Sequence, residues 1–529
     1  MAVCARDKIE RFEANIDFTI EENVLDFPQT WTHSIGSGHA YLALRDDWRT
    51  HLQMVHDELG IEFVRFHGVL DDETFQLTRD EITNELVYNF TLVDSVYDYI
   101  ISLGMKPFVE LSFMPTVLAS GTATWMDYHA NVTPPKNITE WHMVIETFVR
   151  HLSERYGEEV ASWYFEVWNE PNAESRLDCK LPLPPQYCMG TGFWAGDQSQ
   201  YFELYETSAN AIKGVNEQFR VGGPASAGGG WVDDFLAFVM DNNIPVDFIS
   251  THHYPSLENA DSITKDVNND VTAIREAGSD LPYILSEFNT GLEGPIPGIK
   301  ALVDNDDSEY ASSFFIRTIG RTVTKGAEML SYWTFSDVFD EIRLSTVPFH
   351  DGYGLISMDN IRKPVYRAFN LLSSAGGWLL PVTSSVDSTH PCDVFATSTL
   401  QAPSSDGEEI VFNLYVSNSQ PIPNVTTVLE APICSGLLSI QVDPTQNFKL
   451  LSTSITRIDK SHANAYRMWK HEMGSPDPLS EEQTSDLHEA SELVTEASDA
   501  FKINPTTGLI KGNIQVPPFG VALIQLTVS

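Results

Sequence analysis

The chain of 529 residues is long enough for a large barrel and an accessory domain, and its 42% hydrophobic and 20% charged content excludes fibrous and disordered classes. With 74 acidic against 32 basic residues, the formal net charge is −42 at pH 7, so the surface repels nucleic acid and anionic membranes. No apolar run reaches the roughly 18 residues of a membrane span.

The first twenty residues lack the apolar stretch of a secretory signal. We expect a secreted protein from which a signal was removed, with an intracellular location as the alternative. Four Asn-x-Ser/Thr sequons permit N-glycosylation along a eukaryotic secretory route, at Asn89, Asn131, Asn137 and Asn424.

From residue 31 to about residue 335, short apolar runs alternate with amphipathic helical stretches, the pattern of repeated βα units. Candidate strands lie at 31–37, 61–68, 106–112, 163–170, 219–225, 248–254, 282–288 and 328–335. Helices are expected between them, among others at 46–59, 89–103, 140–156, 198–216 and 308–326. Eight parallel strands, each followed by a helix, predict an α/β fold, a (β/α)8 barrel, which we assign to residues 23–370.

Beyond Gly376 the chain becomes β-rich with Pro and Ser turns, and predicts an antiparallel β-sandwich from segments 408–418, 424–432, 437–444 and 520–529. The alternating segment 11–20 is expected to add a strand, so this accessory domain is assigned residues 1–22 plus 371–529. A helical segment near 462–500 is inserted in it. Ser480 and Gln483 form a capping box there, followed at helical spacing by Leu487, Ala490, Val494 and Ala497.

Five cysteines are scattered without the spacing of a zinc site. Cys179 and Cys188 flank a Pro-rich loop that a disulfide would staple, and Cys392 with Cys434 could bridge two nearby strands. Cys4 is then left over. We interpret these residues as structural disulfides or inert thiols.

Two glutamates end predicted barrel strands. Glu170 ends the fourth run, and Glu287 ends the seventh. Because the site of such a barrel forms at the carboxyl ends of its strands, the two carboxylates should face each other across the mouth. Alternation places Glu166, Trp168 and Glu170 on one face of their strand. A pair of this kind suits catalysis on the two sides of one glycosidic bond.

Glycoside hydrolysis needs one protonated carboxyl for the leaving oxygen and one ionised carboxylate for the anomeric carbon. We assign the proton to Glu170, because the negative charge of Glu287 raises its proton affinity. Once Glu287 forms the glycosyl-enzyme, that charge is gone and Glu170 can act as a base towards water.

Side chains around this pair supply candidate ligands. Arg65, on the second run, could keep Glu287 ionised through a charge-assisted hydrogen bond, and His67 on the same face could bond a sugar hydroxyl. Tyr254 could orient Glu287, and His252 could touch substrate, whereas His253 should point away.

Aromatic residues are expected to form the walls of the site. Trp333, on the eighth run, is a candidate stacking floor for a sugar ring, and Phe113 a second wall. Glu341, further along the loop after Trp333, is a candidate hydroxyl ligand.

The runs FVRFHGVL, FEVWNEPN, THHYP, SEFN and HDGYGLISMDNIRKPVYRAF resemble glycoside hydrolase family 39, and SHANAYRMWKHEMGSPDPLSEEQ resembles part of the accessory region of its β-xylosidases. The resemblance spans nearly the whole chain and implies a retaining barrel-plus-sandwich enzyme. It implies Glu170 as acid/base, Glu287 as nucleophile and Asn169 as the contact to the sugar 2-hydroxyl. It implies first-subsite ligands at His67, His252, Tyr254, Trp333 and Glu341. The Cys179 to Cys188 insertion, the acidic surface and the sequons depart from a typical bacterial member.

We therefore expect an exo-acting β-xylosidase without a cofactor, which releases xylose from xylo-oligosaccharides or xylosides. The alternative within the family is another specificity, such as α-L-iduronidase, which should need a basic residue for its carboxylated sugar. The strand-end motifs contain no extra cluster of basic residues. From other classes, His67, His252 and His253 could hold a catalytic metal, or the chain could be a non-catalytic carbohydrate-binding relative lacking one of the two carboxylates.

Overall fold

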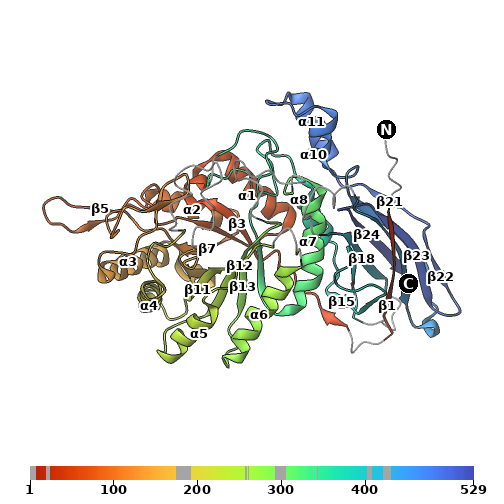
Figure 1. Ribbon diagram of the computed structural model, residues 1–529, viewed down its shortest axis with the longest axis horizontal. Coiled ribbons are helices and arrows are strands. Elements are labelled where there is room, and N and C mark those ends of the chain that lie inside the picture. The colour runs from red at the N-terminus through yellow and green to blue at the C-terminus, as the bar shows by residue number, and fades with distance from the viewer. Residues whose placement is uncertain are drawn as a thin grey trace.

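The computed structural model describes residues 8–19, 24–173, 192–255, 259, 261–291, 305–341, 344–401, 408–420 and 430–529. Within these ranges, no helix has the length and apolar character needed to cross a membrane. Figure 1 shows a barrel, coloured red to green, beside a set of sheets coloured blue. Cys4, Cys179, Cys188, Asn424 and most of the predicted strand at 424–432 lie outside the described residues.

The predicted (β/α)8 barrel is confirmed: eight parallel strands close in the order β10-β11-β12-β13-β14-β3-β4-β7. Their interior positions are almost all buried, which is why the strands read as continuous apolar runs rather than alternating ones. Each predicted run overlaps one of them: β3 (Ser34–His39), β4 (Phe63–His67), β7 (Lys106–Leu111), β10 (Tyr164–Val167), β11 (Arg220–Ala227), β12 (Phe248–His253), β13 (Tyr283–Phe288) and β14 (Ala327–Tyr332).

Helices follow the barrel strands, and local sequence sets several of their ends. Asn137 caps the helix that follows β7 by accepting the N–H of Thr139, and Asp197 with Gln200 forms a capping box at the next one. The barrel helices are α1 (Asp46–Leu59), α2 (Thr91–Ser102), α3 (Ile138–Tyr156), α4 (Gln198–Val215), α5 (Val232–Asp241), α6 (Ser262–Glu276), α7 (Glu309–Thr322) and α8 (Pro364–Leu372).

Short hairpins occupy two of the loops at the carboxyl ends of the barrel strands. One, β5 (Thr78–Arg79) with β6 (Leu86–Val87), projects at the far left of Figure 1. The other, β8 (Thr124–Trp125) with β9 (Ala130–Asn131), buries Asn131, whose amide donates to the carbonyl of Gly121. Because Asn131 is buried, its sequon is not accessible for glycosylation in the folded chain, whereas Asn89 and Asn137 are exposed.

The C-terminal part of the chain, from β15 onward, forms the predicted sandwich together with the N-terminal strands β1 and β2. One sheet has the order β16-β1-β19-β23-β22, the other β2-β15-β17-β18-β24-β20-β21, and their facing apolar side chains form a separate core. The strands are β1 (Ile9–Asp17), β2 (Leu25–Asp26), β15 (Trp378–Leu380), β16 (Val382–Ser384), β17 (Cys392–Ser398), β18 (Ile410–Asn418), β19 (Ile433–Gln441), β20 (Leu450–Ile458), β21 (Thr495–Ala497), β22 (Phe501–Asn504), β23 (Leu509–Val516) and β24 (Val521–Val528).

The N-terminal strand β1, red in Figure 1, lies among these blue strands. It pairs parallel with β19 and antiparallel with β16, so the first sheet is mixed rather than purely antiparallel. A parallel pair forms here because β1 reaches β19 from a distant part of the chain and not through a hairpin.

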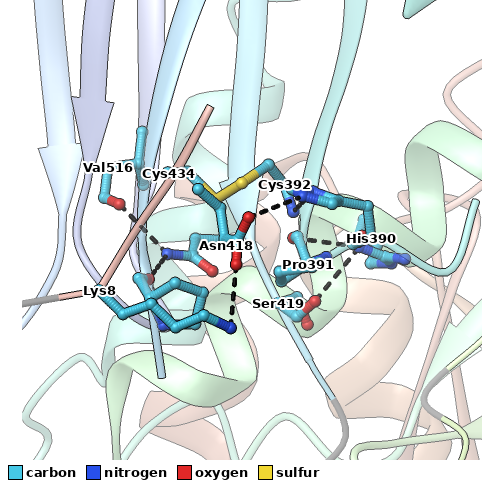
Figure 2. Close-up of a disulfide and its surroundings, with 11 residues drawn as sticks. Lys8, His390, Pro391, Cys392, Asn418, Ser419, Cys434 and Val516 are labelled. Atoms are coloured by element: carbon cyan, nitrogen blue, oxygen red, sulfur yellow. Dashed lines mark hydrogen bonds and ion pairs between the residues drawn. A yellow bond between two sulfur atoms is a disulfide. The ribbon is translucent and has the colours of Figure 1, made fainter. Parts of the chain in front are cut away.

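A disulfide between Cys392 of β17 and Cys434 of β19 links the two sheets, as predicted (Figure 2). The segment that leads into Cys392 is also tied to the barrel, because Arg317 of α7 donates to the carbonyl oxygens of Ser388, His390 and Pro391. The barrel and the sandwich therefore meet across α7.

The inserted helical segment consists of α10 (Ala465–Arg467), a π-helical turn η7 (Met468–Glu472) and α11 (Glu481–Ala490). The capping box of Ser480 and Gln483 is confirmed. The prediction that this helix continues through Val494 and Ala497 is wrong: Val494 is exposed, and Ala497 lies in β21 opposite Ser454. Pairing with β20 overrides the helical spacing of these residues.

Candidate active site

Arg65 of β4 is the centre of a buried charge network inside the barrel mouth. Its Nε donates to Glu166 (2.7 Å), its Nη1 to Glu287 (2.7 Å), and its Nη2 to Asn169 (2.9 Å), with Glu110 2.8 Å from Nη2. The side chain is fully buried, and such a cation is tolerated because carboxylates surround it on several sides.

The backbone after β10 departs from strand alternation. Trp168 has φ of 72° and Glu170 has φ of 41°, both in the left-handed region. Glu166 and Asn169 consequently share Arg65, although alternation places them on opposite faces. The predicted common face of Glu166, Trp168 and Glu170 is therefore wrong for Trp168, whose ring packs against Phe113 while its Nε1 donates to a loop carbonyl.

Glu170 and Glu287 approach closely across the mouth. One oxygen of each, together with a ring nitrogen of His252, lie within 4.8 Å of one another. Nδ1 of His252 is 3.0 Å from Glu170 and 3.3 Å from Glu287. The hydroxyl of Tyr254 donates to Oε2 of Glu287 (2.7 Å), and Arg65 donates to Oε1 of the same carboxylate.

The surroundings separate the protonation states of the two carboxyl groups. Burial, and after it the negative charge of Glu287, raises the pKa of Glu170 to about 8. Burial also raises the pKa of Glu287, but Arg65, His67 and Tyr254 oppose this by stabilising its anion. Because Glu287 has direct donors on both oxygens, it ionises first and the proton stays on Glu170.

His252 stays neutral between the two carboxyl groups. Burial, followed by the nearby charges of Arg65 and His67, lowers its pKa well below the usual value. It can therefore contact both glutamates without adding a charge to the site.

His67 lies between two carboxylates. Its Nδ1 is 2.7 Å from Glu110, and its Nε2 is 3.2 Å from Glu341 and 3.7 Å from Glu287. Burial lowers its pKa, but the charge of Glu110 and the contact with Glu341 outweigh burial and raise that pKa to about 10. Both ring nitrogens therefore carry protons, and His67 is a cation at neutral pH.

Aromatic side chains line the region around His67. Its ring centroid lies 4.7 Å from that of Trp333 and 6.0 Å from that of Phe113. Trp333 packs with Phe339, Tyr353 and Tyr254. A Cβ at Gly36 would lie only 2.4 Å from the indole ring, so glycine is required for Trp333 to lie against β3.

All the predicted site residues are brought into this one cluster. Glu110, Glu166, Phe339 and Tyr353 were not predicted as parts of it. A signal existed for the two glutamates, because a charged residue within an apolar barrel strand is buried and must have a partner. Phe339 and Tyr353 come from the long loop after β14, where no spacing indicates which side chains turn inward.

The three histidines considered for a metal do not converge. Nε2 of His253 lies 2.7 Å from Asp270 of α6, on the side of β12 away from His252, as alternation predicts. His67 is instead engaged by Glu110 and Glu341.

Comparisons with known proteins identify the family of the chain. The sequence pattern of "Glycosyl hydrolases family 39" matches residues 15–508. A β-xylosidase of Caldicellulosiruptor saccharolyticus is 37% identical over 478 residues, covering 88% of this chain and 89% of that protein. A β-xylosidase of Geobacillus stearothermophilus is 30% identical over 528 residues, covering 94% and 93%.

A solved structure of a family 39 β-xylosidase from Caulobacter crescentus superimposes with a TM-score of 0.73 at 29% identity, covering 98% of this chain and 99% of that one. Sequence and fold thus match along almost the whole length. The chain belongs to glycosyl hydrolases family 39 and is a glycoside hydrolase.

Proposed function

We propose that this enzyme is a retaining exo-β-xylosidase, which hydrolyses β-xylosidic bonds of xylo-oligosaccharides or xylosides by double displacement. The observation that supports the retaining mechanism is the close approach of Glu170 and Glu287, since one oxygen of each carboxyl group lies no more than 4.8 Å from an oxygen of the other. Retaining enzymes place their carboxyl groups about 5–5.5 Å apart, and inverting enzymes about 6.5–9.5 Å apart. The β-xylosidase names of the relatives support the choice of sugar.

In the first step, an oxygen of Glu287 attacks the anomeric carbon as the glycosidic C–O bond breaks. The bond electrons go to the leaving oxygen, which takes the proton of Glu170, and the product is a glycosyl ester of Glu287 plus the free alcohol. Arg65 and Tyr254 hold the attacking carboxylate through hydrogen bonds.

In the second step, water attacks the anomeric carbon and gives its proton to Glu170, while the ester bond to Glu287 breaks. Esterification has removed the charge of Glu287, so the pKa of Glu170 is lower at this stage and Glu170 is ionised and able to act as a base. Asn169, held by Arg65, is proposed to contact the 2-hydroxyl of the sugar.

The burial of the site suits removal of a terminal sugar. His67, Phe113, His252 and Trp333 are buried and are proposed, with Glu341, to surround the terminal sugar ring. The side chain of Glu170 is the more accessible of the catalytic pair, at 14% against 5% for Glu287. The leaving group therefore departs on the side of Glu170.

The charge of the site favours a neutral sugar over the carboxylated sugar of an α-L-iduronidase. In the described part of the mouth, both cations are already engaged, Arg65 by three carboxylates and His67 by Glu110 and Glu341. A uronate would add a negative charge with no uncommitted cation to receive it.

A panel of nitrophenyl glycosides tests the substrate. The β-D-xyloside should be cleaved fastest, and faster cleavage of an α-L-iduronide would overturn the assignment. Glu287→Ala should abolish turnover, and added azide should restore part of it with an inverted glycosyl azide as product. Full residual activity of this variant would refute Glu287 as nucleophile.

Glu170→Ala provides the complementary test. It should spare glycosyl-enzyme formation from aryl xylosides with good leaving groups and slow it for poor ones. An equal loss on all leaving groups would contradict the acid role.

We also propose that the enzyme is secreted. The disulfide between Cys392 and Cys434 and the exposed sequons at Asn89 and Asn137 favour an oxidising compartment. Mass spectrometry of the protein from a eukaryotic secreting host should find glycan at these two positions and none at the buried Asn131.

A further inference from the structure

Asn289, which follows Glu287 by two residues, supports the backbone of Trp333, the proposed floor of the sugar pocket. Its Nδ2 donates to the carbonyl oxygens of Trp333 and Tyr353, and its Oδ1 accepts the hydroxyl of Tyr332 (2.9 Å). Trp333 and Tyr353 also pack in one aromatic cluster. The position of the pocket floor thus depends on the segment that carries Tyr353.

That segment is anchored by a buried lysine. Nζ of Lys363 lies 2.6 Å from Asp307, 2.6 Å from Asp337, and 2.8 Å from the carbonyl oxygen of Gly352, so its three N–H groups have three acceptors. Asp337 also accepts the N–H of Gly354 (2.8 Å). The lysine therefore joins the end of the loop after β13 to the loop after β14.

The accessory domain also contacts the loops after β13 and β14. Glu309, the first residue of α7 and two residues from Asp307, is 3% exposed. Arg467 of α10 donates to it through Nε (2.9 Å) and Nη2 (2.7 Å), and Asn464 adds a third bond (2.9 Å). A bidentate pair with a buried carboxylate fixes orientation as well as distance.

Apolar contacts accompany this ion pair. Phe349, in the loop after β14, packs with its ring centroid 5.7 Å from Tyr466 and 5.3 Å from Trp469. These residues form a cluster with Ile361 that is separate from the core of the sandwich. The inserted helical segment, residues 462–491, therefore buries its apolar face against the barrel loops.

We propose that this inserted segment is part of the active-site scaffold, and that Arg467 is a positioning residue for the sugar pocket. Arg467 holds Glu309, while Tyr466 and Trp469 of the same segment pack against Phe349, and together these contacts set the place of Tyr353 beside Trp333. The inference rests on the proposed function, which identifies the pocket as a sugar site. Arg467 acts through the loops and not on the carboxylates, since Glu287 is held by Arg65 and Tyr254.

Arg467→Ala should therefore raise KM for the preferred aryl glycoside about tenfold and change kcat by less than about threefold, because the sugar contact loosens while the carboxylates keep their geometry. Guanidinium ion should restore part of the affinity, and Arg467→Lys should be intermediate. The matched control is Arg457→Ala, since Arg457 of β20 belongs to the same domain but donates to Gln515 within the sandwich. Its KM should stay that of the wild type.

Active sites are counted by trapping the glycosyl-enzyme with a 2-fluoro glycoside, so that a smaller folded fraction lowers the count and leaves KM unchanged. Should Arg467→Ala fail to fold, Glu309→Gln tests the same contact in a near-isosteric variant, with the same expected rise in KM. An unchanged KM in whichever of these variants folds would overturn the proposal.

A crystal structure of the variant gives a readout that does not depend on the substrate. Tyr353 should be displaced relative to Glu287, and an undisplaced Tyr353 would also overturn the positioning role. If the wild type cleaves no glycoside in the panel, the proposed function fails, and this structural comparison still decides whether Arg467 places Tyr353.

Discussion

Replacing Glu287 with Gln should lower the pKa of Glu170 and so expose the electrostatic coupling on which the mechanism depends. Gln keeps the shape of the side chain, and its single amide oxygen can still accept from Arg65, but its NH2 group takes the place of the oxygen that accepts from Tyr254, and it carries no charge. Burial contributes most to the raised pKa of Glu170, with the charge of Glu287 second. The substitution removes only the second contribution.

The magnitude follows from the separation of the two groups. One oxygen of each group lies within 4.8 Å of the other, and two unit charges about 5 Å apart repel by about 3.5 kcal/mol at an effective dielectric constant of about 20. Because one pKa unit corresponds to about 1.4 kcal/mol, the pKa of Glu170 should fall by about 2.5, from about 8 to about 5.5. It should remain above the ordinary value because the side chain stays buried.

The measurement is a pH titration of glutamate carboxyl carbons labelled with ¹³C, with the Glu170 resonance assigned by its loss in Glu170→Gln. Glu341→Gln is the control, because the charge of Glu341 contributes less than that of Glu287 and its removal should produce a smaller fall. A pKa of Glu170 that stays within about 0.5 of the wild-type value in Glu287→Gln would refute the coupling, since roughly 2.5 is expected.

Three further outcomes are expected. The kcat/KM should fall as pH rises through about 8, because Glu170 must be protonated in the free enzyme. This fall at high pH should disappear for Glu170→Gln assayed on a dinitrophenyl glycoside, and an unchanged fall would point to another acid. Arg65→Leu should lower the free energy of unfolding by about 3–5 kcal/mol, read by chemical denaturation, because three buried carboxylates lose their cation; a loss below about 1 kcal/mol would contradict this account. Replacing Cys392 and Cys434 with Ala should destabilise the accessory domain by up to about 4 kcal/mol in urea melts, from the 42-residue separation of the linked positions, and an unchanged midpoint would exclude that contribution.

Local sequence predicted most of the barrel, because its elements carry strong local signals. The run at 46–59 is helical over Asp46–Leu59, and Gly60, with φ of 71°, ends that helix. The helix after Ser480 shows the limit of such signals. Its capping box forms, but the apolar spacing at Val494 and Ala497 belongs to a different element, because strand pairing with β20 is a long-range contact that periodicity does not encode.

The sequence by itself determined which residue types stand at the ends of the barrel strands, and so which carboxylates could face each other. Strand order and the common direction of parallel strands are enough for that conclusion. Only the tertiary structure decided how the charges are shared: Glu110 and Glu166 complete the shell of Arg65, and Asn169 joins it because the backbone at Trp168 leaves strand geometry. It also decided that the accessory segment around Arg467 borders the catalytic loops. Contacts between residues more than a hundred positions apart arise from the packing of whole elements, and no local pattern specifies them.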